Sequence, residues 1–218
     1  MISLRLSYTI SLLISVLAGL FALNANDLEE DRIQLIEAGD KIIAITEREG
    51  QIKFDLSGDT YINGSTRGDI AIALTTKYFI ALNSNLGSWV KSYRYGDESI
   101  ESFVNKSIGG FTSDRRLYAI GKDSKEWKVY DLEGDAILSV ATGKNLACMN
   151  SEKRIFCFSS HTDSWHSHYV HSGSLPSPGF LNRAVKSFSC SENTCTFSGQ
   201  RESILFNATS GKYSVVAK

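Results

Sequence analysis

Short apolar or alternating runs of four to seven residues follow one another along most of the chain. β-Branched and aromatic residues dominate these runs, and Gly, Asn, Asp and Ser separate them. This pattern predicts short β-strands joined by tight turns. Residues 27–42 also carry charges in the manner of a helix, but their place in the order of runs favours a strand.

The runs come in groups of four, and the groups repeat. Trp89, Trp127 and Trp165 open equivalent runs at intervals of 38 residues. Ile52 takes the equivalent place before Trp89, and Tyr213 takes it after Trp165, beyond an insertion that contains both prolines. The sequence therefore contains five repeats, near residues 31–58, 59–97, 98–135, 136–183 and 184–218.

Four strands in every 38 residues or so are typical of a β-propeller blade. A single blade cannot cover its own apolar faces, so blades stack around an axis. We therefore predict an all-β fold, a five-bladed β-propeller of four-stranded repeats. The first repeat lacks an opening strand and the last ends with its own outer strand, so the sequence leaves ring closure and oligomeric state open.

One segment, residues 127–158, resembles the tectonin repeat of tachylectin-like propeller lectins. The matching positions are Trp127, which opens the outer strand, Gly134 before the next inner strand, and the inner strand itself at residues 137–140. Trp89 and Trp165 begin segments that match less closely, and the second tryptophan of the family pattern is absent. The resemblance implies a secreted lectin-like module that binds carbohydrate at repeated shallow sites.

Aromatic side chains are the candidates for such sites, because their faces stack on sugar rings and repeated sites gain avidity. They are Trp89, Trp127, Trp165 and, in the insertion, Phe180. The alternative is that the tryptophans pack between blades and that the protein is an extracytoplasmic interaction scaffold, with residues 172–183 as its partner loop. Exposed tryptophan faces would favour sugar binding, whereas burial between blades would favour the scaffold.

The four cysteines are predicted to pair within two hairpins. A turn between Glu152 and Lys153 places Cys148 opposite Cys157, and the turn after Glu192 places Cys190 opposite Cys195. Opposed residues of an antiparallel pair are close enough for a disulfide bond. Four buried thiols are the alternative, and the spacing is poor for a zinc site.

All four histidines fall between residues 161 and 171. His166 and His168 would point to the same face of a strand, where they could chelate a transition metal with a third ligand from His161, Asp163 or His171. The alternative is a polar outer strand that contains histidine among serine and tyrosine.

Residues 1–25 have the layout of a secretory signal peptide, with Arg5 followed by an apolar run from Ile10 to Leu23. We predict that its removal leaves one propeller domain over residues 26–218. This domain would be secreted or otherwise extracytoplasmic and would have no membrane span.

A formal charge of −1 over 218 residues gives no electrostatic case for nucleic acid as a partner. Motifs for common hydrolases, zinc proteases and nucleotide-binding loops are absent from the sequence, so we predict no enzymatic activity and no cofactor. The expected partners are glycans or a surface or extracellular protein.

Two polar patterns remain. Asp59, Asp97 and Asp135 recur with the repeat, each after a glycine, which indicates a role in turns rather than in catalysis. Three glycosylation sequons begin at Asn63, Asn105 and Asn207, and the sequence does not tell whether they carry glycans.

Overall fold

The computed structural model describes residues 32–151, 153–170, 187–199 and 202–218. The predicted signal peptide, the insertion at 172–183 and Phe180 lie outside the described residues. Every helix or strand within those ranges is a β-strand, as predicted. In this part of the chain there is no helix with the length and hydropathy that crossing a membrane requires.

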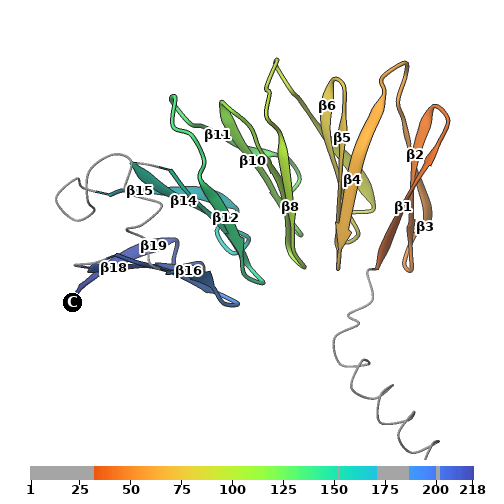
Figure 1. The fold of residues 1–218 in the computed structure, drawn as a ribbon. Helices are drawn as coiled ribbons and strands as arrows, with labels where there is room; N and C mark the ends of the chain where they lie inside the picture. Colours follow the sequence, from red (N-terminus) through yellow and green to blue (C-terminus); the bar gives the residue numbers. More distant parts are fainter. Residues whose placement is uncertain (1–31, 152, 171–186, 200–201) are drawn as a thin grey trace, which may run out of the picture. The chain divides into compact units, whose positions relative to one another are not determined.

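The described strands form five antiparallel sheets, and in each sheet neighbours in sequence pair with one another (Figure 1). The first sheet contains β1 (Ile33–Ala38), β2 (Lys41–Thr46) and β3 (Gly50–Asp55). The second contains β4 (Tyr61–Arg67), β5 (Ile70–Thr75), β6 (Tyr78–Asn83) and β7 (Ser88–Tyr93). The third contains β8 (Glu101–Val104), β9 (Ile108–Thr112), β10 (Arg116–Gly121) and β11 (Lys128–Asp131).

The last two sheets follow the same plan. The fourth contains β12 (Ser139–Thr142), β13 (Leu146–Asn150), β14 (Arg154–Ser159) and β15 (Ser164–Tyr169). The fifth contains β16 (Ser187–Cys190), β17 (Thr194–Ser198), β18 (Glu202–Asn207) and β19 (Lys212–Ala217). The predicted four-strand repeat is thus confirmed in the second to fifth sheets, and the first sheet lacks an opening strand among the described residues, as expected.

β1 resolves the helix-or-strand ambiguity of residues 27–42 over its own length. It pairs with β2 along all six of its residues. In β2, Ile42, Ala44 and Thr46 are buried while the residues between them are half-buried. This period of two is that of a strand with one covered face, so tertiary packing decides against the helix here.

Successive sheets pack face to face through apolar side chains. Buried residues of neighbouring sheets share clusters, and examples from the three central interfaces are Phe79 with Phe111, Phe103 with Phe156, and Ile155 with Phe206. Among the described strands, extensive contacts join successive sheets only, and none joins the first sheet to the fifth. The fold is therefore all-β and built of stacked antiparallel sheets, consistent with a β-propeller.

Burial differs between the middle and the ends of the series. The second strands of the middle sheets, β5, β9 and β13, are buried along their whole length. In contrast, β2 of the first sheet and β17 of the fifth alternate between buried and half-buried residues. A middle sheet has both faces covered, whereas an end sheet has one.

A recurring turn leads into each of the second, third and fourth sheets. Its aspartates, Asp59, Asp97 and Asp135, are buried, and each follows a glycine with positive φ. Each aspartate accepts a hydrogen bond from a hydroxyl group 16 residues later, and these hydroxyl groups belong to Thr75, Ser113 and Ser151. The recurring aspartates thus tie the turn between two sheets to a turn inside the next sheet.

A cation completes two of these networks. The Nε atom of Arg154 lies 2.6 Å from the carboxylate of Asp135, and its Nη1 atom lies 2.9 Å from Glu133. Arg116 lies 3.5 Å from Asp97 in the same place one repeat earlier. In the first of the three turns burial raises the pKa of Asp59, but hydrogen bonds led by that of Thr75 outweigh it and leave the pKa below its usual value.

Both predicted disulfide bonds are present. Cys148 and Cys157 lie directly opposite each other on β13 and β14, with their Cα atoms 4.1 Å apart. Cys190 and Cys195 pair in the same way at the ends of β16 and β17, with a Cα separation of 4.0 Å. The hairpin register predicted from the turn residues is correct in both cases.

Candidate functional site

An exposed group of tyrosines and cations lies where the second sheet meets the third. Tyr78 opens β6, Lys91 and Tyr93 lie on β7, Tyr95 lies in the following turn, and Arg116 opens β10. The side chains of Tyr93 and Tyr95 are 53% and 70% exposed. We call these five residues the tyrosine patch.

The rings and cations of the patch form a continuous row. Tyr78 and Tyr93 lie opposite each other across the strand pair, with ring centroids 4.6 Å apart and hydroxyl oxygens 3.1 Å apart. The Tyr95 ring follows at 5.8 Å from that of Tyr93. Lys91 Nζ lies 4.8 Å from the centre of the Tyr78 ring, and Arg116 Cζ lies 5.5 Å from that of Tyr95. Both cations are thus placed for cation–π contact.

The recurring turn holds one end of the patch in place. Tyr95 has a φ of 48°, two residues before the buried Asp97 of the same turn. The carboxylate of Asp97 lies 3.5 Å from Arg116, which also donates a hydrogen bond of 3.5 Å to the hydroxyl oxygen of Tyr118. The guanidinium group over Tyr95 is therefore fixed by a buried anchor of the fold.

The cations of the patch are Lys91 and Arg116, and the charge of Arg116 is partly balanced by the buried carboxylate of Asp97. The hydrogen bond with Tyr78 raises the pKa of Tyr93, and the opposing influence of Lys91 and Lys77 does not reverse this shift. The hydrogen bond to Tyr118 raises the pKa of Arg116. Exposed tyrosine beside arginine is the composition of protein-binding hot spots, because it combines large apolar area with fixed hydrogen-bond donors.

The tryptophans predicted to bind sugar lie between sheets. Trp127 is buried in the cluster of the second and third sheets, and its Nε1 atom donates to the carbonyl oxygen of Val90 at 3.4 Å. Trp165 is half-buried beside Phe158, and its Nε1 atom donates to the backbone carbonyl oxygen of Lys128 at 2.9 Å. Both indoles therefore join a sheet to the outer strand of the sheet before it.

Trp89 occupies the equivalent place one repeat earlier. It is half-buried against the first sheet, with its ring 5.8 Å from that of Phe54. Its Nε1 atom is buried and has no hydrogen-bond partner among the described residues. All three tryptophans thus pack between sheets, the arrangement expected of the scaffold. Phe180 lies outside the described residues.

His166 and His168 lie on one face of β15, as predicted, and that face packs against the fifth sheet. The His166 ring lies 5.6 Å from that of Phe206, and the His168 ring stacks on Tyr213 at 5.1 Å. Burial lowers the pKa of His166. Among the described residues, the only set of three or more metal-ligating groups in reach of one ion consists of cysteines, so metal binding by the histidines stays a prediction.

A cavity of about 370 Å³ opens between the third and fourth sheets. Its lining includes the carboxylates of Glu101, Asp114 and Asp135 together with the apolar side chain of Leu138. None of the residues that line it is aromatic or cationic. The cavity therefore offers no ring on which a sugar could stack, and its charge opposes an acidic ligand.

One of the three sequons is part of the fold. Asn105 is buried, and its side-chain nitrogen donates to the carbonyl oxygens of Gly143 and Leu146 at 2.6 Å and 3.1 Å. Its side-chain oxygen accepts from the backbone of Ser107 and Ile108. A glycan on this nitrogen would break the link between the third and fourth sheets. Asn63, in contrast, is exposed on β4.

The sequence analysis did not identify the tyrosine patch. The signal was present in two tyrosines on either side of Arg94, directly before the recurring Gly-Asp pair. It was missed because the patch depends on a third tyrosine from β6 and on an arginine from the next repeat.

No protein-family model and no curated protein matches the sequence, so membership of the tectonin family is not shown. Among solved structures, the chain is similar to Hsv2 of Kluyveromyces lactis at a TM-score of 0.39 and 7% identity, over 87% of this chain and 70% of that chain. It is also similar to PorZ, a surface component of the type-IX secretion system of Porphyromonas gingivalis, at a TM-score of 0.38 and 13% identity. This match covers 88% of this chain and 27% of that chain. The match to the N-terminal domain of Nup159 has a TM-score of 0.38 and 11% identity, and it covers 86% of this chain and 58% of that chain.

Proposed function

We propose that this protein is a non-enzymatic binding module whose tyrosine patch binds an acidic segment of a protein partner. The observation that carries the proposal is the row of three tyrosine rings, two of them exposed, with a lysine over the first and an anchored arginine over the last. Rings of this kind bury a large area at low entropic cost, and the cations attract carboxylates and set the orientation.

Protein has more support than carbohydrate as the ligand class. The tryptophans that would stack on sugar pack between sheets instead, and two of them use their indole nitrogens within the fold. On the patch, a cation occupies one face of the Tyr78 ring and of the Tyr95 ring, where a sugar would stack. Carbohydrate binding remains the alternative to be tested.

We also propose that the stacked sheets are blades of a five-bladed propeller and that the protein works outside the cytoplasm. The four-strand repeat of the second to fifth sheets supports the first proposal. The two disulfide bonds support the second, since such bonds persist in oxidising compartments.

Two probe sets test the binding proposal on the purified protein: fluorescent peptides rich in Asp and Glu, measured by anisotropy, and a glycan array. We expect selective, salt-sensitive binding of acidic peptides over basic peptides of equal length. Tyr95→Ala and Arg116→Ala should each weaken it by about tenfold or more, as for hot-spot residues.

Tyr169→Ala is the matched control, because Tyr169 is also exposed and also lies under an arginine, in the fourth sheet. It should leave peptide binding unchanged. Equal binding of acidic and basic peptides, or an equal loss in the control, would contradict the proposal. If the protein binds glycans and Tyr95→Ala does not change this binding, the three tryptophans would again be candidates for a carbohydrate site.

A further inference from the structure

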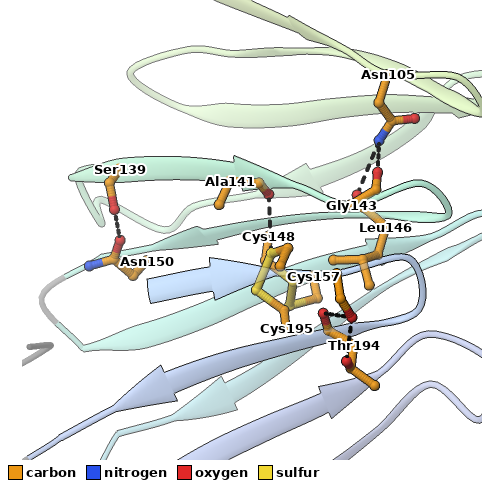
Figure 2. The surroundings of a disulfide bond; sticks show 12 residues. Asn105, Ser139, Ala141, Gly143, Leu146, Cys148, Asn150, Cys157, Thr194 and Cys195 are labelled. Carbon is orange, nitrogen blue, oxygen red and sulfur yellow. Dashed lines mark hydrogen bonds between the residues drawn. A yellow bond between two sulfur atoms is a disulfide. The ribbon is translucent and has the colours of Figure 1, made fainter. Parts of the chain in front are cut away.

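The two disulfide bonds lie side by side at the interface of the fourth and fifth sheets. The sulfur atoms of Cys148, Cys190 and Cys195 are within 4.8 Å of one another, and the sulfur of Cys157 is bonded to that of Cys148. Figure 2 shows the side chains of Cys148, Cys157 and Cys195 meeting between their strands. Sulfur atoms from two hairpins that are distant in sequence thus gather at one point, the four-sulfur cluster.

The surroundings of the four-sulfur cluster are largely buried and apolar. Cys148, Cys157 and Cys195 have no solvent exposure, and Cys190 is half-buried. The same core cluster contains side chains such as Phe197. No carboxylate or imidazole among the described residues joins the sulfurs as a candidate ligand. The donor set is therefore sulfur alone, which selects thiophilic ions such as Zn²⁺ over Mg²⁺ or Ca²⁺.

We propose that, once reduced, these four cysteines bind one Zn²⁺-like ion as a tetrathiolate site. Zinc takes four thiolates in a tetrahedron with bonds of about 2.3 Å, which places neighbouring sulfurs about 3.8 Å apart. The observed spread of three sulfurs from both hairpins lies close to this requirement. The cysteine spacing in the sequence argued against zinc, whereas the packed sheets bring sulfurs of both hairpins together.

A dithiol or a phosphine can reduce both disulfide bonds. Each disulfide accepts two electrons and two protons and becomes two thiols, while the dithiol becomes a disulfide, or the phosphine takes oxygen from water and becomes its oxide. Binding of the ion then releases four protons as four thiolates form. Affinity should therefore rise with pH, and binding should stabilise the fold.

The test is a Co²⁺ titration of the phosphine-reduced purified protein without oxygen, followed by displacement with Zn²⁺. We expect one equivalent of Co²⁺, with the thiolate-to-cobalt charge-transfer absorption of four sulfurs. The oxidised protein should show no such absorption. Ion binding should also raise the melting temperature of the reduced protein and leave that of the oxidised protein unchanged.

Single substitutions test whether both hairpins contribute. Cys148→Ser and Cys190→Ser should each weaken binding by at least about tenfold, since even loss of an outer-shell group costs that much. Thr196→Ser is the matched control, because Thr196 follows Cys195 on β17 and points to the opposite face. It should bind as the unchanged protein does.

Three results would overturn the proposal. One is a reduced protein that keeps its β-sheet spectrum but shows no thiolate–cobalt absorption. Another is unchanged binding after both cysteines of the second hairpin are replaced by serine. The third is a reduced protein that unfolds and does not recover its β-sheet spectrum when Zn²⁺ is added.

Discussion

The fourth and fifth sheets form the same turn with different side chains. Between β13 and β14, Ser151 donates its backbone N–H to Arg154 at 2.8 Å, and both side chains bind Asp135. Between β17 and β18, Gly199 donates to Glu202 at 2.9 Å in the equivalent place. A glycine has no hydroxyl group and a glutamate has no positive charge, so these two described residues cannot form the contacts that Ser151 and Arg154 make with Asp135.

In the fourth sheet, Ser151 and Arg154 both close a backbone turn and bind Asp135, and the comparison with the fifth sheet separates these two roles. The backbone hydrogen bond that closes the turn forms in the fifth sheet with a glycine and a glutamate at these two positions, so in the fourth sheet the side chains of Ser151 and Arg154 serve another purpose. Asp135 belongs to the turn that leads into the fourth sheet, and the network ties that turn down. In the fifth sheet a disulfide joins β16 to β17 instead, through Cys190 and Cys195. Buried charge thus holds the turn before the first strand of the fourth sheet, whereas a covalent bond holds the first strand of the fifth sheet.

The largest predicted effect follows from removing the buried charge. Asp135→Ala leaves the guanidinium group of Arg154 without its buried carboxylate partner, and both side chains are only 5% exposed. Breaking a buried ion pair costs about 3–5 kcal/mol of unfolding free energy. Urea unfolding followed by circular dichroism would measure the loss.

Glu202→Ala is the matched control, because Glu202 stands where the fourth sheet has Arg154. We expect a change within about 0.5 kcal/mol, as for substitutions outside such networks. A comparable loss in the two variants would show that the ionic network has no special part in holding the fourth sheet.

The second prediction concerns the covalent bond. Replacing Cys190 and Cys195 by alanine removes a crosslink with a sequence separation of 5, and replacing Cys148 and Cys157 removes one with a separation of 9. Loop entropy predicts losses of about 2 kcal/mol and somewhat more than 2.5 kcal/mol, respectively. Urea unfolding of the two double variants would test this order, and the reverse order would mean that strain, not loop length, governs these bonds.

What the sequence could predict was local or periodic. The strands, both cysteine hairpins and the three-stranded first sheet followed from alternation and from the 38-residue repeat. The hydroxyl partner of each recurring aspartate lies at a constant 16 residues and could have been found by aligning the repeats. The tyrosine patch and the four-sulfur cluster could not, because each joins residues of two sheets, and their approach depends on how sheet faces pack.

A smaller effect on stability should distinguish Trp165 from Trp89, which occupies the equivalent place in an earlier repeat. Trp165→Phe removes the hydrogen bond of 2.9 Å to Lys128 and should cost about 1 kcal/mol. Trp89→Phe removes a buried N–H group that has no partner among the described residues, so its loss of stability should be smaller than that of Trp165→Phe by about 1 kcal/mol. Thermal unfolding of both variants would decide. A loss for Trp89→Phe as large as that for Trp165→Phe would mean that this N–H group has a partner in solution.

The smallest predicted effect is a pH dependence at the interface of the fourth and fifth sheets. Burial against the fifth sheet lowers the pKa of His166, whose Nε2 atom lies 2.8 Å from the hydroxyl oxygen of Thr162. The unfolded chain binds the proton near pH 6.5, whereas the folded protein binds it only at lower pH. The contribution of His166 is therefore fully present above about pH 6.5 and falls as the pH drops from there toward the folded pKa.

The pH range in which His166 changes the stability of the fold differs from the range in which Asp59 does. Asp59 has a lowered pKa, so its contribution persists down to about pH 4 and is lost below it. Urea midpoints at about pH 7.5 and about pH 5.5 should therefore report the histidine and not the aspartate. His166→Gln should reduce the difference between the two midpoints. A difference that His166→Gln leaves unchanged would mean that the pH dependence arises elsewhere.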